Sequence, residues 1–567
     1  RGIGQYPGRL SQFTAPKMVK DYTYRNIALN RMVYTSSNAD FNLTGHLVTD
    51  GIITSKAPSF LSVKTNEGEL SNRDKEKMID GNTVTSQYIK GENAFVEFNW
   101  EAMKVNLKKL EFTGELAFYK DKASQGYTIR VMGSHNGKKW EVLGEEKGSD
   151  LPGVATKQQV SSDPNKFQDV VKLPLRKLNV SIPLKKPGSY EHVRIELIMP
   201  GAAWWRIKLI DNSTSWRPSM HFASVWKSDL AKKTDAKAQW LYVDLGTEAD
   251  FDQVNLFWIN KARNGKIQVS NDAKNWSDIA TLGQQKQKGL IEKIACKGHG
   301  RYVRLLLTEP DASGRFALSE MQVMGKGGLR AETANTLTST NGKQMLNQWQ
   351  LRREGSDTWI QATVPGTVLT SYMNIGAVPD NRYDDNMRQI SESFFNSDFW
   401  YRTTIEYKPS ANKQQHTYLN FDGINWKANI LLNGEKIGRI DGAFIRSRID
   451  ITKKLKPGAN KLEVHVIKNA HFGVVKQKNL QNTDLNGGEL GADNPTFHAS
   501  IGWDWITNTP GREIGIWNDV YLTHDNGVSV SDPVVTSTLN LPDTLATMTP
   551  SVFLQNADAA EKTVKLA

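Results

Sequence analysis

A chain of 567 residues is too long for one hydrophobic core, so its length predicts three or four domains. Lys and Arg exceed Asp and Glu by 72 − 60 = 12, but both signs are scattered along the chain, which argues against a nucleic-acid-binding surface. The single cysteine, Cys296, excludes an internal disulfide, and no apolar run reaches the roughly 18 residues of a membrane span.

Alternation of apolar and polar residues dominates the chain, which is the pattern of β-strands with one buried face. Clusters of Asn, Asp, Gly and Lys separate these segments and predict turns. Long amphipathic helices are absent, so we expect an all-β protein with several β-sandwiches in series. The clearest predicted strands are, in chain order, 94–100, 127–134, 192–199, 239–246, 266–271 and 301–308.

An internal repeat is visible in the first half of the chain. The segment "YTIRVMGSHNGKKWEVLG" at 127–144 matches "GKIQVSNDAKNWSDIATLG" at 265–283, with Trp140 corresponding to Trp276. Both segments read as strand, polar turn, tryptophan and strand. A second pair of matching segments follows, at 190–210 and 300–323. The repeat therefore predicts two copies of one sandwich.

The second copy carries the motifs "WLYVDLG", "IQVSNDAKNW", "GRYVRL" and "ALSEMQV", and it resembles the discoidin (coagulation factor 5/8 type C) domain. It is also similar to family 32 carbohydrate-binding modules, which are jelly rolls. The usual opening segment of that family lies far upstream, at 26–52. We therefore predict one discoidin-like domain over 24–55 plus 214–326, with a second, 56–213, inserted into one of its loops, where insertions are tolerated. Two tandem domains with unusual starts are the alternative, and 1–23 is expected to be an extension.

The third predicted unit spans 340–525, after a linker at 327–339. Its motifs "VPGTV", "FWYR", "LNFDGINWKANILLNG", "GWDW" and "GIWNDVYL" resemble the sugar-binding jelly roll that opens glycoside hydrolase family 2 enzymes, in the β-mannosidase and exo-β-glucosaminidase branch. Asn433-Gly434 predicts a type I′ turn in its central hairpin. Residues 526–567 resemble the first strands of the immunoglobulin-like domain that comes next in this family.

The catalytic machinery of the resembled family is not in this sequence. Retaining glycosidases use two carboxyl groups about 5 Å apart, and in this family both come from a (β/α)₈ barrel of about 250 residues. We therefore expect the non-catalytic N-terminal portion of an exported bacterial hydrolase, periplasmic or secreted, that acts on terminal β-mannosides or β-glucosaminides. The missing C-terminal barrel would be its partner in the same polypeptide. A stand-alone carbohydrate-binding protein and a scaffold without a ligand are the alternatives.

The resemblance implies a substrate-binding role for Trp503 and Asp504. In β-mannosidase-like members, the sugar-binding domain contributes a Trp-Asp pair to the substrate pocket. A carboxylate accepts strong charge-assisted hydrogen bonds from sugar hydroxyls, and an indole covers the apolar C–H groups. Alternatively, Asp504 caps the following turn, while Trp503 and Trp505 are core residues. The segment reads "GWDWI" instead of the "GWDWG" common in β-mannosidases, so the sugar stays open.

Two further candidate sites lie in the discoidin-like copies. Trp204 and Trp205 precede the last strand of the inserted copy, and Phe316 takes this place in the outer copy. Adjacent strand residues face opposite ways, so we expect one tryptophan in the core and the other as a candidate for stacking on a sugar. The alternative is a purely structural role.

A structural Ca²⁺ is the one metal that the family resemblance implies, and no cofactor is required. Asp80 and Asn82, in "DGN", offer the hard oxygen ligands that Ca²⁺ prefers, and Asp50 fits more weakly. The alternative is an ordinary turn, because Asp, Gly and Asn are the common turn residues.

Overall fold

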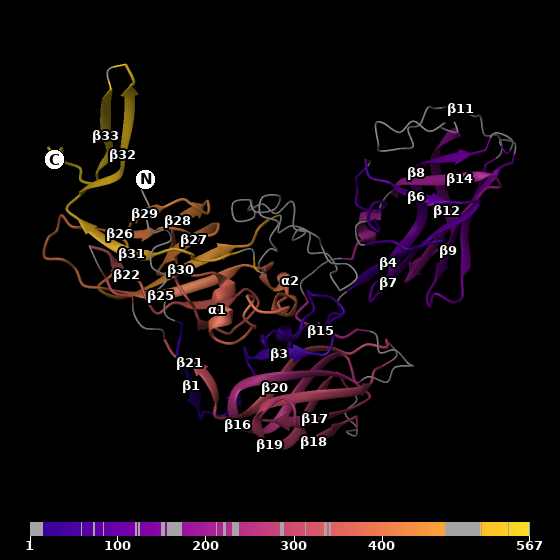
Figure 1. Cartoon of the computed structure of the whole chain (residues 1–567), viewed down its shortest axis with the longest axis horizontal. Helices are drawn as coiled ribbons and strands as arrows, with labels where there is room; N and C mark the ends of the chain where they lie inside the picture. Colours follow the sequence, from indigo (N-terminus) through magenta and orange to yellow (C-terminus); the bar gives the residue numbers. More distant parts are fainter. Residues whose placement is uncertain are drawn as a thin grey trace. The chain divides into compact units, whose positions relative to one another are not determined.

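The structure is a computed structural model of the chain (Figure 1). It divides into two compact units, which are described separately. The first unit comprises Arg1–Ser55, Ser224–Val475 and Asp484–Ala567, and the second comprises Lys56–Ala223 and Lys476–Thr483. The structure describes residues 15–565 apart from 58, 72–73, 83, 120–121, 123–124, 149–153, 156–172, 211–212, 219–222, 230–237, 284–288, 312, 334–336, 340–341, 471–510, 512 and 543.

The N-terminal part of the first unit is a β-sandwich built mainly on one eight-stranded sheet. Its main path runs β15-β20-β16-β19-β17-β18, while β2 pairs with β20 and β3 with β16. The segments on either side of residues 56–223 therefore share one sheet. The strands are β1 (Met18–Asp21), β2 (Arg25–Asn26), β3 (Met32–Thr35), β15 (Trp226–Lys227), β16 (Gln239–Asn260), β17 (Asn264–Ser270), β18 (Ser277–Leu282), β19 (Ile291–Glu309), β20 (Ala317–Lys326) and β21 (Gly328–Ala331).

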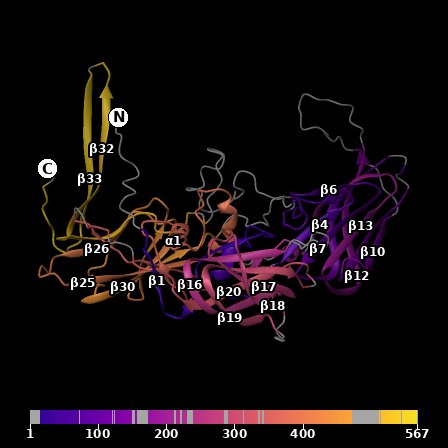
Figure 2. The same ribbon diagram turned by 60° about the horizontal axis from the view of Figure 1, so that its bottom comes forward.

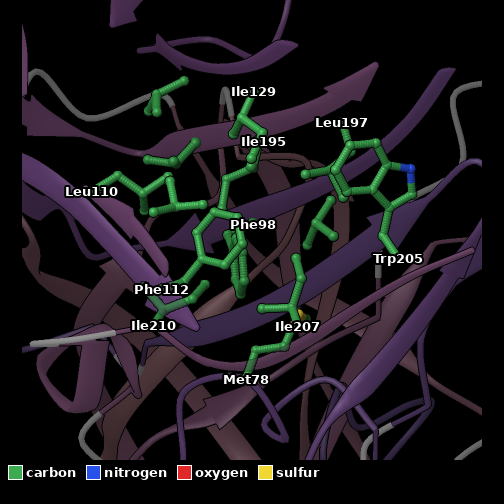
Figure 3. Close-up of a cluster of buried hydrophobic side chains, with 14 of the residues drawn as sticks. Met78, Phe98, Leu110, Phe112, Ile129, Ile195, Leu197, Trp205, Ile207 and Ile210 are labelled. Atoms are coloured by element: carbon green, nitrogen blue, oxygen red, sulfur yellow. The ribbon is translucent and has the colours of Figure 1, made fainter. Parts of the chain in front are cut away.

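The second unit is a sandwich of two sheets, coloured indigo to magenta in Figures 1 and 2. One sheet has the order β10-β9-β13-β7-β4-β5 and the other β11-β12-β8-β14-β6. Phe98 from the first sheet and Phe112 and Trp205 from the second meet in the apolar core between them (Figure 3). The strands are β4 (Phe60–Thr65), β5 (Gly68–Glu69), β6 (Gln87–Lys90), β7 (Asn93–Glu101), β8 (Val105–Phe118), β9 (Tyr127–Ser134), β10 (Glu141–Gly148), β11 (Val154–Ala155), β12 (Pro174–Tyr190), β13 (His192–Ile198) and β14 (Ala202–Ile210).

The C-terminal part of the first unit contains a second sandwich, with sheets β22-β31-β26-β29 and β24-β23-β25-β30-β27-β28. Asn433 and Gly434 have φ angles of 53° and 84°, which confirms the predicted type I′ turn between β27 and β28. The elements are β22 (Gln344–Met345), β23 (Gln350–Arg353), β24 (Ile360–Gln361), α1 (Val368–Asn374), α2 (Glu392–Phe395), β25 (Phe399–Tyr407), β26 (His416–Phe421), β27 (Lys427–Leu432), β28 (Glu435–Asp441), β29 (Ser447–Asp450), β30 (Gly458–Ile467) and β31 (Val520–Asp525).

A two-stranded hairpin, β32 (Val528–Asn540) and β33 (Leu545–Asn556), follows this sandwich. Val534 and Val535 are neighbours on β32 and so face opposite ways, yet both are exposed, as are Met548 and Phe553 on β33. Within the described residues, the hairpin therefore has uncovered apolar side chains on both faces. An isolated hairpin of this kind is marginally stable in water.

The all-β prediction is confirmed, and each of the six predicted strands overlaps an observed strand. Cys296 is buried, and burial raises the pKa of its thiol to about 11, as expected of a small core residue without nucleophilic character. Among the described residues, no helix combines the length and apolar character that a membrane span requires.

Candidate functional sites

Trp204 and Trp205 lie on β14, between β8 and β6, and the structure shows which of them is a core residue. Trp205 is 1% exposed and belongs to the core of the second unit. Its indole Nε1–H donates a hydrogen bond to the carbonyl oxygen of Gly91 at 3.2 Å. The indole is therefore both packed and satisfied, which leaves no face for a sugar.

Trp204 points to the opposite, outer face of the same sheet and is half-buried. Its ring meets that of Tyr88 edge to face, with centroids 5.2 Å apart, and Tyr88 is 43% exposed. Beside them, Arg206 donates to Glu115 (Nη1 to Oε2, 3.1 Å). The Trp204 patch consists of Trp204, Tyr88, Arg206 and Glu115. Its aromatic rings could cover sugar C–H groups, and its charged side chains could hydrogen-bond hydroxyls.

Trp503 and Asp504 fall within 471–510, outside the described residues. The chain is described again at Gly511 and, two residues later, at Glu513. Glu513 contributes its carbonyl oxygen, which accepts a hydrogen bond from the Nδ2 of buried Asn425 at 3.0 Å. Burial raises the pKa of the Glu513 side chain above its ordinary value. The sequence after Asp504 therefore returns to the body of the C-terminal sandwich.

Asp80 and Asn82 lie in a hydrogen-bonded turn. Asp80 Oδ1 accepts from the Asn82 amide at 2.8 Å, and Asp80 Oδ2 accepts from the Thr85 hydroxyl at 2.8 Å. Asn82 Oδ1 in turn accepts from the amide of Val84 at 2.9 Å. No cluster of three or more His, Cys, Asp and Glu side chains suited to a metal occurs in the described part of the chain. Asp80 and Asn82 thus make the hydrogen bonds of an ordinary turn, which is the alternative explanation of the "DGN" pattern.

Asp50 and Glu320 form a buried pair of carboxyl groups in the first unit, with exposed fractions of 7% and 0%. Glu320 Oε2 accepts from the amide of Gly51 at 3.3 Å, whereas its Oε1 is buried without a hydrogen-bond partner. Burial raises the pKa of Asp50 to about 7, and burial together with the charge of Asp50 raises that of Glu320 well above its ordinary value. Two buried oxygen-rich side chains of this kind would suit a bound hard cation.

Phe316 is fully buried in the core of the N-terminal sandwich, so it is not available to stack on a sugar. The repeated tryptophans also have a structural role. Trp140 lies under the guanidinium of Arg194 (4.6 Å to the ring centroid), and Trp276 lies under that of Arg304 (4.0 Å). The repeat therefore preserves a cation–π pair in each copy.

Comparison with known families locates two resemblances. Residues 349–518 match the model of the glycosyl hydrolase 2 galactose-binding domain-like family, and residues 208–305 match that of the NedA-like, galactose-binding domain of F5/8 type C proteins. Both resemblances predicted from the sequence are thereby confirmed for these segments. The matched segments alone fix no activity for the whole chain.

Curated relatives of the chain are carbohydrate-active proteins. Mannosylglycoprotein endo-beta-mannosidase of Lilium longiflorum is 37% identical over 179 residues, which is 31% of this chain and 18% of the relative. Exo-beta-D-glucosaminidase of Amycolatopsis orientalis is 26% identical over 212 residues, which is 36% of this chain and 18% of the relative. The chain thus aligns with less than a fifth of these relatives' length.

Two solved structures are among those that match part of the chain. The exo-chitosanase CsxA of Amycolatopsis orientalis matches with a TM-score of 0.29 and 19% identity, over 39% of this chain and 25% of that chain. Beta-D-mannosidase of Dictyoglomus thermophilum matches with a TM-score of 0.29 and 21% identity, over 38% of this chain and 31% of that chain.

Proposed function

We propose that this chain is the carbohydrate-binding N-terminal portion of an exported bacterial glycoside hydrolase that removes terminal β-mannosyl or β-glucosaminyl residues from a glycan. The observation that carries the proposal is the match of residues 349–518 to the glycosyl hydrolase 2 galactose-binding-like family. Segments of 179 to 212 residues of the chain align with a mannosidase and with glucosaminidases, which supports these two sugars as substrates. Periplasmic or cell-surface location is part of the proposal, with the resemblance to the mannosidase and the glucosaminidases as its support.

Catalysis would then come from a (β/α)₈ barrel in the same polypeptide. The relatives are much longer than the segment they share with this chain, which leaves room for such a barrel in them. The β32–β33 hairpin exposes apolar side chains on both faces. Exposed apolar surface of this kind is usually covered in stable proteins, so these side chains support the presence of further structure that packs on the hairpin. In this proposal the hairpin opens the immunoglobulin-like domain that stands between the sugar-binding domain and the barrel.

The Trp204 patch is the part of this function that the described residues can test. Trp204→Ala should weaken binding of mannan or chitosan about tenfold, since truncating a central aromatic side chain removes its stacking surface. The dissociation constant would be measured by isothermal titration calorimetry or affinity electrophoresis on the whole chain.

The matched control is Trp140→Ala, which removes an indole from the residue just before β10, a strand of the other sheet of the same unit. It should leave the dissociation constant unchanged. If Trp204→Ala binds these glycans as tightly as the parent chain does, the patch is not a sugar site. If the parent chain binds none of them, a scaffold role for the second unit is favoured instead.

A structural Ca²⁺ site is a second candidate function, and the unpartnered Oε1 of buried Glu320 favours Asp50 and Glu320 as its ligands over Asp80 and Asn82. A bound Ca²⁺ would neutralise two carboxylates that burial otherwise disfavours in their charged form. Asp80 and Asn82 stay the alternative, since their turn also presents oxygen atoms.

Added Ca²⁺ should therefore stabilise the first unit, by about 1.4 kcal/mol when its free concentration is tenfold above Kd. Thermal unfolding in Ca²⁺ and in EDTA would measure the effect. Glu320→Gln should abolish the Ca²⁺ response, because the neutral amide keeps the volume but not the charge. Loss of the response in Asp80→Asn instead would assign the metal to the turn, and identical melting in Ca²⁺ and EDTA would exclude both sites.

A further inference from the structure

A hollow of about 600 Å³ lies on the N-terminal sandwich of the first unit, where β16, β19 and β20 approach the segment between β1 and β2. Tyr22 and Tyr24 line one side, while Asp250, Asp252 and His299 are among the polar residues of the other. All of these belong to the first unit, whereas the Trp204 patch belongs to the second. The hollow is therefore a separate feature that the sequence motifs did not reveal.

The two tyrosines are unusually accessible aromatic side chains, with exposed fractions of 71% for Tyr22 and 47% for Tyr24. Their short segment is fixed at both ends, because β1 pairs with β21 and β2 pairs with β20. The hydroxyl of Tyr24 also donates to Asp252 Oδ1 at 2.7 Å, which raises the pKa of Tyr24. The backbone of this segment and the ring of Tyr24 are thus held in place before any ligand arrives, which lowers the entropic cost of binding.

Charged groups of both signs form a row beside the tyrosines. Strand pairing places Asp250 opposite His299 on β19 and opposite Lys326 on β20. The His299 Nδ1 lies 2.7 Å from Asp250 Oδ1, and the Asp250 side chain is 80% exposed, so its carboxylate is accessible to a ligand. Lys297, two residues before His299, also lines the hollow.

Exposed tyrosine rings beside charged groups of both signs favour one class of ligand. Carboxylates beside ammonium groups give no strong net field, which disfavours a polyanion as much as a polycation. A ring with several hydroxyls satisfies both kinds of side chain, since each hydroxyl donates to a carboxylate and accepts from an ammonium group. The exposed tyrosine rings supply the apolar surface that the C–H face of a pyranose requires.

We propose that the tyrosine hollow, formed by Tyr22, Tyr24, Asp250, Asp252, Lys297 and Lys326, is a second carbohydrate-binding site that holds one pyranose residue of a glycan. The inference rests on the proposed carbohydrate-binding function and extends it to the first unit. Two sites on one chain would raise the avidity for a polysaccharide when both can engage the same molecule.

The test uses the whole chain with two defined probes, β-1,4-mannotriose and the β-1,4-linked trimer of glucosamine. Binding would be measured by calorimetry and by saturation-transfer NMR, in the parent chain and in Trp204→Ala. The double substitution Tyr22→Ala with Tyr24→Ala is then added to both backgrounds. In the Trp204→Ala background, we expect the remaining affinity for at least one trimer to fall more than tenfold.

Tyr383→Ala is the matched control, because Tyr383 is also a highly exposed tyrosine of the first unit. It should leave the affinity unchanged, and the tyrosine substitutions should keep the melting temperature of the background that carries them, because the replaced tyrosine rings are exposed. Equal trimer affinities with and without the tyrosines would overturn the inference, even if Trp204→Ala shows that the proposed function is correct. If the double tyrosine substitution abolishes binding and Trp204→Ala does not, the hollow is supported as a sugar site and the Trp204 patch is excluded as one. No binding of either trimer by the parent chain would overturn both.

Discussion

Trp205→Ala should lower the free energy of unfolding of the second unit by about 3–5 kcal/mol, as expected when a large buried aromatic side chain is truncated. The indole is 1% exposed, it packs in the core between the two sheets, and its Nε1–H satisfies the carbonyl oxygen of Gly91. The substitution removes all three contributions and leaves a cavity. Native-state hydrogen exchange of the β8 and β14 amides would measure the loss within this unit alone.

Trp204→Ala is the internal control, because it removes the same side chain one position earlier, on the outer face of the same strand. We expect its effect on the same amides to stay within about 1 kcal/mol. The pair thus separates stability from ligand binding: Trp205 should affect folding, and Trp204 should affect affinity for glycans. Equal destabilisation by both substitutions would contradict the assignment of the two faces.

The sequence indicated that one of these two tryptophans is buried, but it could not say which. The register of β14 against β8 shifts twice, between Ala202 and Trp204 and again between Ile207 and Leu209. A shift of one residue exchanges the two faces of a strand, and simple alternation from either end of the segment therefore becomes unreliable. The local pattern of residues predicted that a strand is present here. Which face of the sheet carries Trp204 depends on how that strand pairs with a strand far away in the sequence.

Sites that are assembled from distant segments could not be predicted from the sequence for the same reason. Tyr24 and Asp252 are 228 residues apart in sequence, yet they form one hydrogen bond of the tyrosine hollow. Asp50 was noted as a weak Ca²⁺ candidate, but its neighbour Glu320 lies on β20, and nothing local joins the two. Phe316 shows the opposite case, because this aromatic residue takes the place of the tryptophan pair in the outer copy but is buried in the core.

The nested order of the first two domains was predicted from the order of the sequence motifs, and strand pairing in the structure bears on part of that prediction. Motif order suggested that residues 24–55 belong with 214–326, and β3 does pair with β16, with Met32–Thr35 facing Leu241–Asp244. Antiparallel pairing of this kind requires that the chain return to the same sheet after residues 56–223. The domain boundaries themselves stay a prediction, since strand pairing fixes neighbours and not the limits of a folding unit.

Asp504→Ala is expected to have the largest effect on catalysis in the proposed full polypeptide with its barrel. Loss of a charge-assisted hydrogen bond to the terminal sugar should lower kcat/KM roughly 30-fold or more, which corresponds to a loss of about 2 kcal/mol of transition-state stabilisation. The melting temperature should stay the same. Steady-state kinetics on β-mannoside and β-glucosaminide substrates would measure the loss and would also show which sugar is preferred.

The conservative variant Asp504→Asn keeps the size of the side chain and one acceptor oxygen but removes the charge. If Asp504 binds sugar hydroxyls, Asp504→Asn should fall between the parent and Asp504→Ala in kcat/KM. If Asp504 instead caps the turn that leads to Gly511, Asp504→Ala should melt at a lower temperature with unchanged kinetics, because a lost cap costs stability of about 1 kcal/mol and leaves the substrate pocket intact. Asp504→Asn should then melt close to the parent, because its amide oxygen can still cap the turn. The two roles therefore predict opposite pairs of observations, so a single set of two variants distinguishes a substrate ligand from a structural carboxylate.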